Sequence, residues 1–500
     1  MKNVNENEKF DVAIIGAGIT GCMTAYMLAG YDLRVAVLER GPDVAVGATG
    51  ANSAIVHAGF DPKPGTVKAA LNAKGARMLL EIARKLGVKH RVNGAYVMAF
   101  NDEDERAHVK QLIEWGKLNG VEKLEFLEGD EVRAREAAVS DNVTCALFAP
   151  ESGIVCPYGL AIAVAEVAAV NGTGFFFGFE AKKIEKDPEN GVFSVSDGNG
   201  RTVRADYIVN AAGTHAEDIA FLCGEDDFPA RALPRRGEYM LLDKNCGSMI
   251  NSTLFACPGK MGKGIILSPT ADGNIILGPN AHDVGKDDTF TTPEGLEEIV
   301  RGASRLVKKL DTRPVITQFA GVRPNCVLGD FYLKASEKVP GLIHLAGIES
   351  PGLASSPAVA LTGVGLLEDA GLKLRERKNY IPDRPPHIEF RELSDEEKDA
   401  LVRRDPSYGR VICRCENITE GEILDAIRRP LGARTVDMVK RRTRAGMGRC
   451  QGGFCMPRVI GILSRELGVP MTEIRKSDGD SFFVPEELRP DPETDGGNRK

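Results

Sequence analysis

Long apolar runs and a strong charge of one sign are both missing from this sequence. The most apolar stretch, AIAVAEVAAV at 161–170, is broken by Glu166 and falls well short of the roughly 20 residues that span a bilayer. The opening segment, MKNVNENEKF, is polar and lacks the apolar core of a secretory signal. The formal net charge of −7 over 500 residues does not indicate a nucleic-acid surface. These absences predict a cytoplasmic protein that binds no nucleic acid, with peripheral membrane contact still open.

The composition is that of a globular protein with room for two or three domains. Hydrophobic residues make up 43% and charged residues 27% of the chain. Its 11 cysteines, without a secretory signal, indicate a reducing compartment, where clustered thiols more often hold metals than form disulfides. One basic segment, KRRTR at 440–444, fits either a docking patch for an acidic partner or a solvated face.

The segment FDVAIIGAGITGCMTAYMLA at 10–29 has the pattern of a nucleotide-binding turn. A short apolar run predicts a buried strand, and the residues after G-A-G-I-T-G predict a helix. Gly16 permits a tight turn, Gly18 lets the backbone approach a pyrophosphate, and Gly21 allows the helix to pack closely on the strand. A second predicted strand, RVAVLER, contains Glu39, 18 residues beyond Gly21, where a carboxylate can bond ribose hydroxyls. A glycine-rich turn without a ligand is the alternative.

Three later stretches favour FAD over NAD as the nucleotide. Residues 46–60, VGATGANSAIVHAGF, form a second segment of small residues, and ADYIVNAAG at 205–213 is an apolar strand that ends in small residues. Residues 342–365 read as a strand, a loop of glycine, serine and proline, and a helix with Pro357 in its first turn. The N-terminus of that helix is suited to an electron-rich ring oxygen.

With these motifs the sequence resembles the FAD-dependent oxidoreductases of the D-amino-acid-oxidase-like superfamily, in the branch of glycerol-3-phosphate dehydrogenase and L-2-hydroxyglutarate oxidase. The resemblance covers about residues 8–375. It implies an α/β fold, in which a Rossmann-like FAD-binding domain carries an inserted substrate domain built on a mixed β-sheet. The expected FAD contacts are Gly16, Gly18, Gly21, Glu39, Arg40, Thr49, Asn52, Ser53, Ala212, Gly213, Gly347, Gly352, Leu353 and Ala354.

The wide spacing of the motifs predicts an FAD domain assembled from separated segments of the chain. We expect residues 8–84, 151–228 and 316–378 in the FAD domain and residues 85–150 and 229–315 in the substrate domain. Three prolines within NYIPDRPPHIEF predict an extended linker over 379–407. Residues 408–475 should form a small helical domain, and residues 486–500 a flexible tail.

Four cysteines in the last hundred residues follow the pattern C-x-C, 34 residues, C-x4-C; they are Cys413, Cys415, Cys450 and Cys455. Four thiolates can hold tetrahedral zinc or the two irons of a [2Fe–2S] cluster, and the tight C-x-C pair argues mildly against zinc. A redox disulfide is the third reading. The region resembles the bacterioferritin-associated-ferredoxin-like domain fused to flavin dehydrogenases, which implies a [2Fe–2S] cluster. The other seven cysteines are expected in the core.

Oxidation of an alcohol at a flavin needs a base for the hydroxyl proton and a cation for an anionic substrate. The resemblance places His57 beside the flavin ring, as a base or as the site of a covalent bond to FAD. It also assigns Arg323 to the substrate's phosphate or carboxylate. Lys263 and Tyr239 are further candidates for the pocket. The alternatives are a packing histidine, an arginine paired with a structural carboxylate, an exposed lysine and a strand tyrosine.

The resemblance leaves several substrates open and favours sn-glycerol 3-phosphate. L-2-hydroxyglutarate oxidases carry a histidine in the strand where this sequence has Ile265 and Ile266. The fused cluster domain resembles the anaerobic type of glycerol-3-phosphate dehydrogenase, whose partners are a second flavoprotein and an electron-carrying subunit. We therefore expect an oligomeric dehydrogenase that passes electrons from FAD through [2Fe–2S] to a partner protein. A dehydrogenase or oxidase of an L-2-hydroxy acid or amino acid, and a non-catalytic electron-transfer subunit, are the alternatives.

Overall fold

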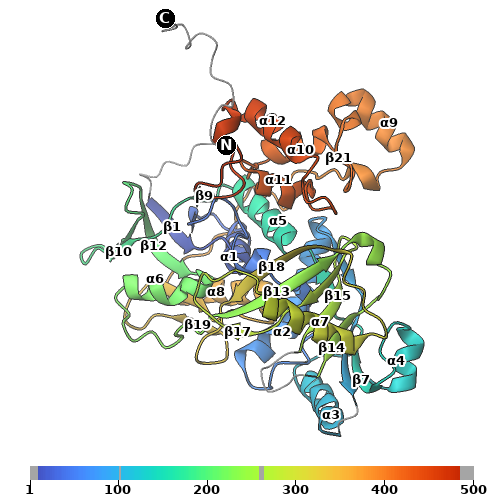
Figure 1. The fold of residues 1–500 in the computed structure, drawn as a ribbon. Coiled ribbons are helices and arrows are strands. Elements are labelled where there is room, and N and C mark those ends of the chain that lie inside the picture. The colour runs from blue at the N-terminus through green and yellow to red at the C-terminus, as the bar shows by residue number, and fades with distance from the viewer. Residues whose placement is uncertain (1–8, 101–102, 258–263, 485–500) are drawn as a thin grey trace, which may run out of the picture. The chain divides into compact units, whose positions relative to one another are not determined.

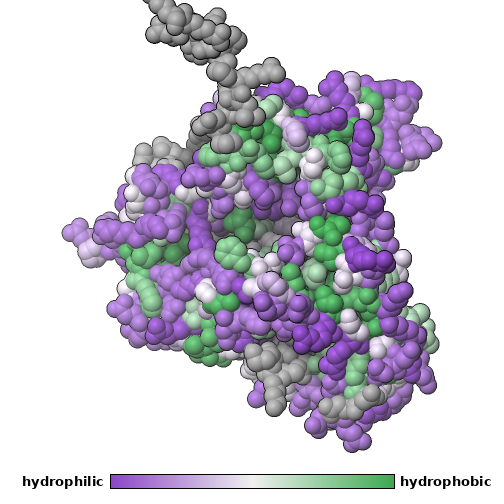
Figure 2. Space-filling model, in the orientation of Figure 1, coloured by the Kyte–Doolittle hydropathy of each residue, from purple (hydrophilic) through white to green (hydrophobic). Residues whose placement is uncertain are grey.

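The computed structural model describes residues 9–100, 103–257 and 264–484, and the chain divides into two compact units, Met1–Arg384 and Pro385–Lys500. In the described part of the chain, no helix is both long and apolar enough to cross a bilayer. Hydrophilic residues cover most of the face drawn in Figure 2, and hydrophobic residues form separate patches on it.

The first sheet of the first unit has a parallel centre in the order β9-β2-β1-β12-β20. Its strands are β1 (Lys9–Ile15), β2 (Val35–Glu39), β9 (Gly174–Phe177), β12 (Thr202–Asn210) and β20 (Leu342–Ala346), extended by antiparallel β10 (Lys183–Lys186), β11 (Phe193–Ser196) and β19 (Tyr332–Ala335). The central strands read as unbroken apolar runs because helices and other elements cover both faces of the sheet. In Figure 1, β1 and β12 lie side by side, near α1 and α5.

The helices of this half are α1 (Ile19–Leu28), α2 (Val67–Lys85), α5 (Pro157–Val170), α6 (Ala216–Leu222) and α8 (Gly352–Asp369). Helix α1 packs on α5 and α8, and α2 packs on α8. The apolar stretch at 161–170 is thus a buried part of α5, and Glu166 within it is fully buried, 3.6 Å from Arg384. Its alanines allow the close approach to α1.

The second sheet is mixed and has nine strands. Its strands are β5 (Ala95–Phe100), β6 (Glu125–Glu128), β7 (Val143–Ala149), β13 (Arg235–Leu242), β14 (Thr253–Ala256), β15 (Ile266–Pro269), β16 (Ile275–Gly278), β17 (His282–Asp283) and β18 (Val315–Arg323). Helices α3 (Glu103–Leu118), α4 (Gly129–Arg135) and α7 (Pro293–Leu306) pack on it, and Figure 1 shows α7 across β13 and β15.

Strand β18 corrects one expected domain boundary. Residues 316–323 were expected in the FAD domain, but β18 pairs with β13 along its length, from Arg235 opposite Arg323 to Leu242 opposite Val315. The backbone hydrogen bonds of β18 are satisfied by the second sheet, so the return to the first sheet comes later, at β19 and β20. A small third sheet joins β3 (Ile55–Val56), β8 (Gly153–Val155) and β4 (His90–Val92).

The second unit is helical, with one short hairpin. It contains α9 (Asp395–Arg404), β21 (Val411–Cys413), β22 (Ile418–Thr419), α10 (Glu420–Arg428), α11 (Val436–Thr443) and α12 (Met456–Leu467). Short 3-10 turns occur in both units. Those of the first unit are η1 (Ala48–Gly50), η2 (Gly213–His215) and η3 (Lys244–Cys246), and those of the second are η4 (Phe390–Glu392), η5 (Pro406–Gly409) and η6 (Met471–Glu473).

Helix α9 corrects the expectation of an extended linker over 379–407. It begins with a capping box, in which the Ser394 hydroxyl accepts a hydrogen bond from the Glu397 N–H and the Glu397 carboxylate accepts one from the Ser394 N–H. The prolines upstream obscured this start signal. The tail expected at 486–500 lies outside the described residues.

Candidate functional site

The turn after β1 has the geometry of a dinucleotide cradle. Gly16 has a φ of +105°, and a Cβ there would lie 2.5 Å from the Ala211 carbonyl oxygen. A Cβ on Gly21 would lie 1.9 Å from the Gly16 carbonyl oxygen, so α1 can approach the turn only with glycine. At Gly18 the nearest atom to a Cβ is the Thr49 hydroxyl at 3.4 Å, which is ordinary contact distance. The protein itself does not demand a glycine at 18, which agrees with the close approach of a ligand there.

Glu39 closes this turn from the end of β2. Its carboxylate accepts hydrogen bonds from the N–H groups of Ala17 and Gly41, both at 2.7 Å. Burial raises the pKa of Glu39, and these two hydrogen bonds oppose the shift. Each carboxylate oxygen keeps a further lone pair, so Glu39 can hold the loop and still accept a ribose hydroxyl.

The predicted FAD contacts between residues 40 and 53 lie on the loop after β2, and most of them form hydrogen bonds or ion pairs within the protein. The Thr49 hydroxyl accepts a hydrogen bond from the Ile19 N–H at 2.9 Å, at the start of α1. Asn52 braces the loop, donating to the Thr49 carbonyl at 2.8 Å and accepting from the Ala54 N–H at 2.7 Å. Arg40 instead forms an exposed ion pair with Asp287 at 2.7 Å, which gives its guanidinium a protein partner. Ser53 is half-buried on the same loop.

Two further predicted segments adjoin the first sheet. Ala212 and Gly213 follow β12, and the Ala211 N–H donates to the Ile15 carbonyl, which joins this segment to β1. Gly347, with a φ of +65°, follows β20, and a Cβ there would lie 2.7 Å from the Cys326 sulfur. Helix α8 starts with Gly352, Leu353 and Ala354. Four separated segments thus meet at one end of the parallel strands, where ligands bind in open α/β sheets.

Arg323 lies at the end of β18 and contacts β13 and the segment between β16 and β17. The Arg323 Nη2 donates to the Asn280 carbonyl at 2.8 Å, and the Tyr239 side chain forms a hydrogen bond with the Arg323 side chain. Tyr239 is 3% exposed and stacks on Phe319 with ring centroids 4.9 Å apart. Burial raises the pKa of Tyr239, and the charge of Arg323 opposes this shift. The structure therefore brings Arg323 and Tyr239 together.

Two glycines that sequence reasoning missed shape this region. Gly237 on β13 lies where a Cβ would be 2.6 Å from Arg323 Nη2, so the missing side chain makes room for the guanidinium. Gly321, opposite Gly237 on β18, lies where a Cβ would be 2.1 Å from the Ala51 carbonyl oxygen. The glycine inside the strand pattern RRGEYMLL was the available signal, because such glycines mark close approach of another group.

His57 follows β3 and is 7% exposed, with its ring centroid 5.7 Å from that of Phe255. Its backbone carbonyl accepts a hydrogen bond from the Asn72 amide at 3.0 Å. A cavity of about 10 Å³ beside the ring, which Asp61 also lines, has room for roughly one water molecule. The other residues that line this cavity are mainly apolar, so His57 and Asp61 are its polar groups. Lys263, the remaining candidate, lies outside the described residues.

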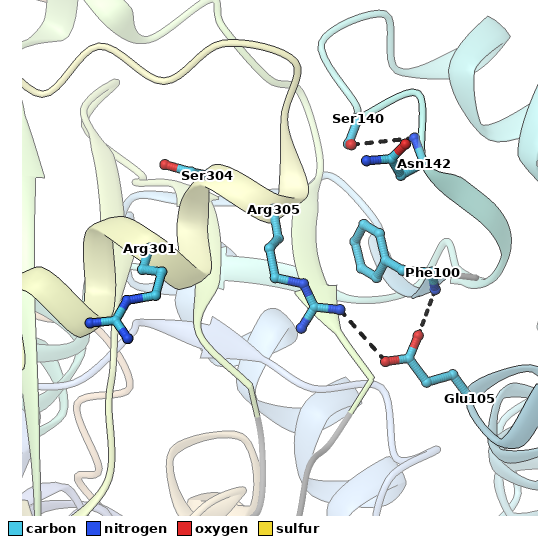
Figure 3. Close-up of a pocket in the computed structure, with 7 residues that line it drawn as sticks. All are labelled: Phe100, Glu105, Ser140, Asn142, Arg301, Ser304 and Arg305. Carbon is cyan, nitrogen blue, oxygen red and sulfur yellow. Dashed lines mark hydrogen bonds and ion pairs between the residues drawn. The ribbon is translucent and has the colours of Figure 1, made fainter. Parts of the chain in front are cut away.

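A second hollow, of about 490 Å³, lies at the edge of the second sheet. Figure 3 shows Arg305 of α7 reaching toward Glu105 of α3, 3.8 Å away, whereas Arg301 points away from that pair. The Glu105 carboxylate also accepts a hydrogen bond from the Phe100 N–H at 2.6 Å. None of the predicted FAD or substrate residues lines this hollow.

In the second unit the four cysteines form two neighbouring pairs. Cys415 Sγ lies 3.6 Å from Cys450 Sγ, and Cys413 is hydrogen-bonded to Cys455. In the described part of the chain, no three cysteine, histidine or acidic side chains are grouped closely enough to hold one ion. Two pairs of thiols fit the two irons of a [2Fe–2S] cluster better than one tetrahedral zinc.

Backbone N–H groups surround these sulfurs. The Cys455 thiol and the N–H groups of Gly446 and Glu416 lower the pKa of Cys413 to about 6. Burial raises the pKa of Cys450, but the Phe454 N–H, the Cys415 thiol and the Gly452 N–H lower it, and the net shift is downward. Backbone N–H donors directed at the sulfurs are the environment that a negatively charged cluster needs.

Comparison with known proteins agrees with both cofactors. Residues 11–362 match the family of FAD dependent oxidoreductases. The chain belongs to this family. Residues 411–465 match the BFD-like [2Fe-2S] binding domain, and all four paired cysteines lie in this stretch. FAD and a [2Fe–2S] cluster are therefore the cofactors of this oxidoreductase, and the cradle after β1 and the paired thiols are suited to hold them.

Relatives of this oxidoreductase include two that act on glycerol 3-phosphate. A glycerol 3-phosphate dehydrogenase of Caloramator mitchellensis is 46% identical over 476 residues, 95% of this chain and 98% of the relative. A glycerol 3-phosphate oxidase of Mycoplasma pneumoniae is 31% identical over 75% of this chain and 97% of its own length. The solved L-alpha-glycerophosphate oxidase of the same organism, with FAD bound, aligns with a TM-score of 0.72 and 28% identity, covering 76% of this chain and 100% of that one.

Proposed function

We propose that this oxidoreductase is a glycerol-3-phosphate dehydrogenase, which oxidises sn-glycerol 3-phosphate to dihydroxyacetone phosphate and passes the electrons through its cluster to a partner protein. One observation carries the proposal: the likeness to the Caloramator dehydrogenase extends over 95% of the chain, so it includes the cluster unit as well as the flavin unit. The partner belongs to the class of electron carriers, such as a second flavoprotein or an electron-carrying subunit.

In this proposal Arg323 binds the phosphate. Its planar guanidinium can donate to two phosphate oxygens, while its bond to the Asn280 carbonyl and the contact with Tyr239 fix its direction. His57 accepts the proton of the substrate's secondary hydroxyl as the adjacent carbon loses a hydride. Bound FAD supplies the hydride acceptor. The proton then leaves His57 toward the small cavity that Asp61 also lines.

A local feature supports glycerol 3-phosphate over L-2-hydroxyglutarate. Ile266, at the position where hydroxyglutarate oxidases were expected to carry a histidine, is 2% exposed and packs in one cluster with Phe255 and Ala58. Ile265 packs against Gly302 of α7. Neither side chain offers a hydrogen bond to a second carboxylate, which the longer diacid would bring into the pocket.

An anaerobic absorbance titration of the cluster-replete enzyme tests the proposal. Glycerol 3-phosphate should bleach the flavin band within seconds, and L-2-hydroxyglutarate and amino acids should not. Arg323→Ala should need far more substrate for the same bleaching, whereas Arg313→Ala, which removes an arginine that is 90% exposed, should behave as the parent. If only a hydroxy acid or an amino acid bleaches the flavin, that compound and not glycerol 3-phosphate is the substrate. Bleaching by dithionite alone would indicate a non-catalytic electron-transfer subunit.

A further inference from the structure

The four cluster cysteines differ sharply in exposure. Cys413 and Cys455 are buried, at 1% and 3%, whereas Cys450 is half-buried and Cys415 is exposed. Cys415 and Cys450 form the 3.6 Å pair described above. The loops that carry them touch closely, since a Cβ on Gly448 would lie 2.3 Å from the Cys415 Cβ. A cluster held by these thiols has one edge toward solvent, at Cys415 and Cys450.

Exposed arginines and one exposed phenylalanine lie beside Cys415 and Cys450 in the sequence. Phe454, directly before Cys455, is 82% exposed, the largest value among the large hydrophobic residues of the described chain. Its N–H donates to the Cys450 sulfur, which fixes its backbone beside the edge. We define the cluster face as Cys415 with its exposed neighbours Arg414, Arg449, Phe454 and Arg458. An aromatic side chain flanked by arginines is the composition that dominates binding energy in protein interfaces.

The charge around the edge is opposite in sign to that of the whole chain. Residues 411–417 and 440–458 contain seven basic residues and one acidic residue, Glu416, in a chain of net charge −7. Glu416 is buried and bonded to Arg391 and Arg444, at 3.0 and 2.8 Å, so it does not offset the exposed arginines. An oxidised four-thiolate [2Fe–2S] cluster carries a formal charge of about −2, which leaves the two segments positive.

We propose that the cluster face is the docking surface for a small acidic redox protein, which accepts electrons one at a time at the Cys415–Cys450 edge. The inference rests on the proposed function, because it takes the cluster as the exit for electrons from FAD. Each encounter moves one electron: the reduced cluster is oxidised and the acceptor protein is reduced. Two encounters remove the two electrons that one substrate molecule leaves on FAD. Carboxylates on the acceptor meet the arginines, and Phe454 packs at the centre of the contact.

The charge arrangement fits an electron carrier in particular. Electron transfer weakens steeply with distance, so the acceptor has to reach the exposed edge of the cluster. Opposite charges around that edge steer encounters and raise association rates, but they add little lasting affinity at physiological salt. Fast and short-lived contacts are what repeated one-electron steps require. Burial of a single exposed phenylalanine is enough to orient the contact without making it permanent.

The test uses full-length, cluster-replete enzyme and two one-electron probes of opposite charge. Oxidised soluble cytochrome b5 is acidic and cytochrome c is basic. Enzyme reduced with glycerol 3-phosphate is mixed with each probe in a stopped-flow instrument, and haem reduction is followed at several ionic strengths. The variants are Arg414→Glu/Arg458→Glu and Phe454→Ser. The matched control is Arg403→Glu/Arg404→Glu, which makes the same change of charge on the exposed end of α9.

At low salt the cluster-face double variant should lower the second-order rate constant for the acidic cytochrome by about tenfold or more, and flatten its dependence on salt. Phe454→Ser should lower it several-fold without changing the salt dependence. Calorimetric titration with oxidised acidic cytochrome should show the same order of weakening without any turnover. The control variant should behave as the parent, and visible absorbance should show an unchanged cluster content.

Three results would overturn the docking surface: an unchanged rate in the cluster-face variant, an equal loss in the α9 control, or a slower reduction of the cluster by the enzyme's own flavin. If Arg414→Glu lowers the cluster content, Arg458→Glu alone gives the answer, since Arg458 lies three residues beyond the nearest cysteine. Enzyme that only dithionite reduces would refute the proposed substrate, while dithionite-reduced enzyme would still report on the cluster face.

Discussion

Replacing Gly237 with alanine should damage substrate binding although no charged or polar side chain is replaced. The added Cβ would lie 2.6 Å from Arg323 Nη2 and 2.7 Å from the Pro279 Cβ. Ordinary contacts of this kind begin near 3.4 Å, and Pro279 is fixed by its ring, so the guanidinium has to move by about 1 Å. That movement breaks the bond of Arg323 to the Asn280 carbonyl and turns the donors away from the bound anion.

The size of the effect follows from the bonds that are lost. A hydrogen bond to a charged group contributes about 1.5–3 kcal/mol. With a tenfold change for each 1.36 kcal/mol, kcat/KM should fall about 10- to 150-fold in Gly237→Ala. If Arg323 binds the phosphate equally in the ground and transition states, the loss appears mainly in KM. Arg323→Ala should lower kcat/KM further than Gly237→Ala, because it removes the positive charge altogether.

Steady-state kinetics with an artificial electron acceptor measure this, together with the FAD content and the thermal midpoint of each variant. Gly285→Ala is the matched control, since a Cβ there meets nothing within 4 Å. Gly237→Ala should keep its FAD, because Gly237 lies on the second sheet and outside the cradle after β1. Kinetics equal to those of Gly285→Ala would refute the packing argument. Loss of FAD would show that the strand, not the guanidinium, had moved.

Three further changes test the other parts of the site. His57→Asn should lower kcat by about 100-fold or more with bound FAD retained, measured by single-turnover flavin reduction, because the general base is lost. Burial raises the pKa of Glu39, so acidification from about pH 7 to about pH 5 protonates it earlier than an exposed glutamate. The FAD Kd, followed by flavin fluorescence, should therefore rise over this range. The Glu39→Gln variant should bind FAD more weakly at about pH 7, and its FAD Kd should change less with pH. Cys415→Ser should abolish the cluster signal in electron paramagnetic resonance while substrate still bleaches the flavin at the parental rate.

The cofactors were predictable because each motif is local in the sequence. The Gly16–Gly21 pattern lies between a strand and a helix, and the structure confirms both elements and the positive φ at Gly16. The C-x-C and C-x4-C pairs likewise predict which thiols come together in the second unit. The glycine motif carries its geometry within about twenty residues and the cysteine motif lies within one contiguous unit, so a single sequence is sufficient to recognise both.

The rest depended on contacts between distant residues. The need for glycine at 237 arises from an arginine 86 positions later, and that at 321 from the backbone of Ala51. No local pattern states that β18 pairs with β13, which is why residues 316–323 were assigned to the other domain. Arg40 is expected at the nucleotide from the family resemblance, and in the structure its side chain pairs with Asp287. Side-chain direction at a strand end is decided by tertiary partners.

The order of strands in the first sheet has a consequence for synthesis of the protein. Its parallel centre begins with β1 at Lys9 and is complete only with β20, which ends at Ala346. A growing chain therefore cannot finish the flavin cradle until more than two thirds of it has been made, and its early strands wait for distant partners. The second unit draws only on contiguous residues from Pro385 onward, so its contacts are local and form quickly. A gene fragment for that unit alone should yield a folded cluster protein, whereas a cut anywhere between β1 and β20 should leave neither half able to retain FAD.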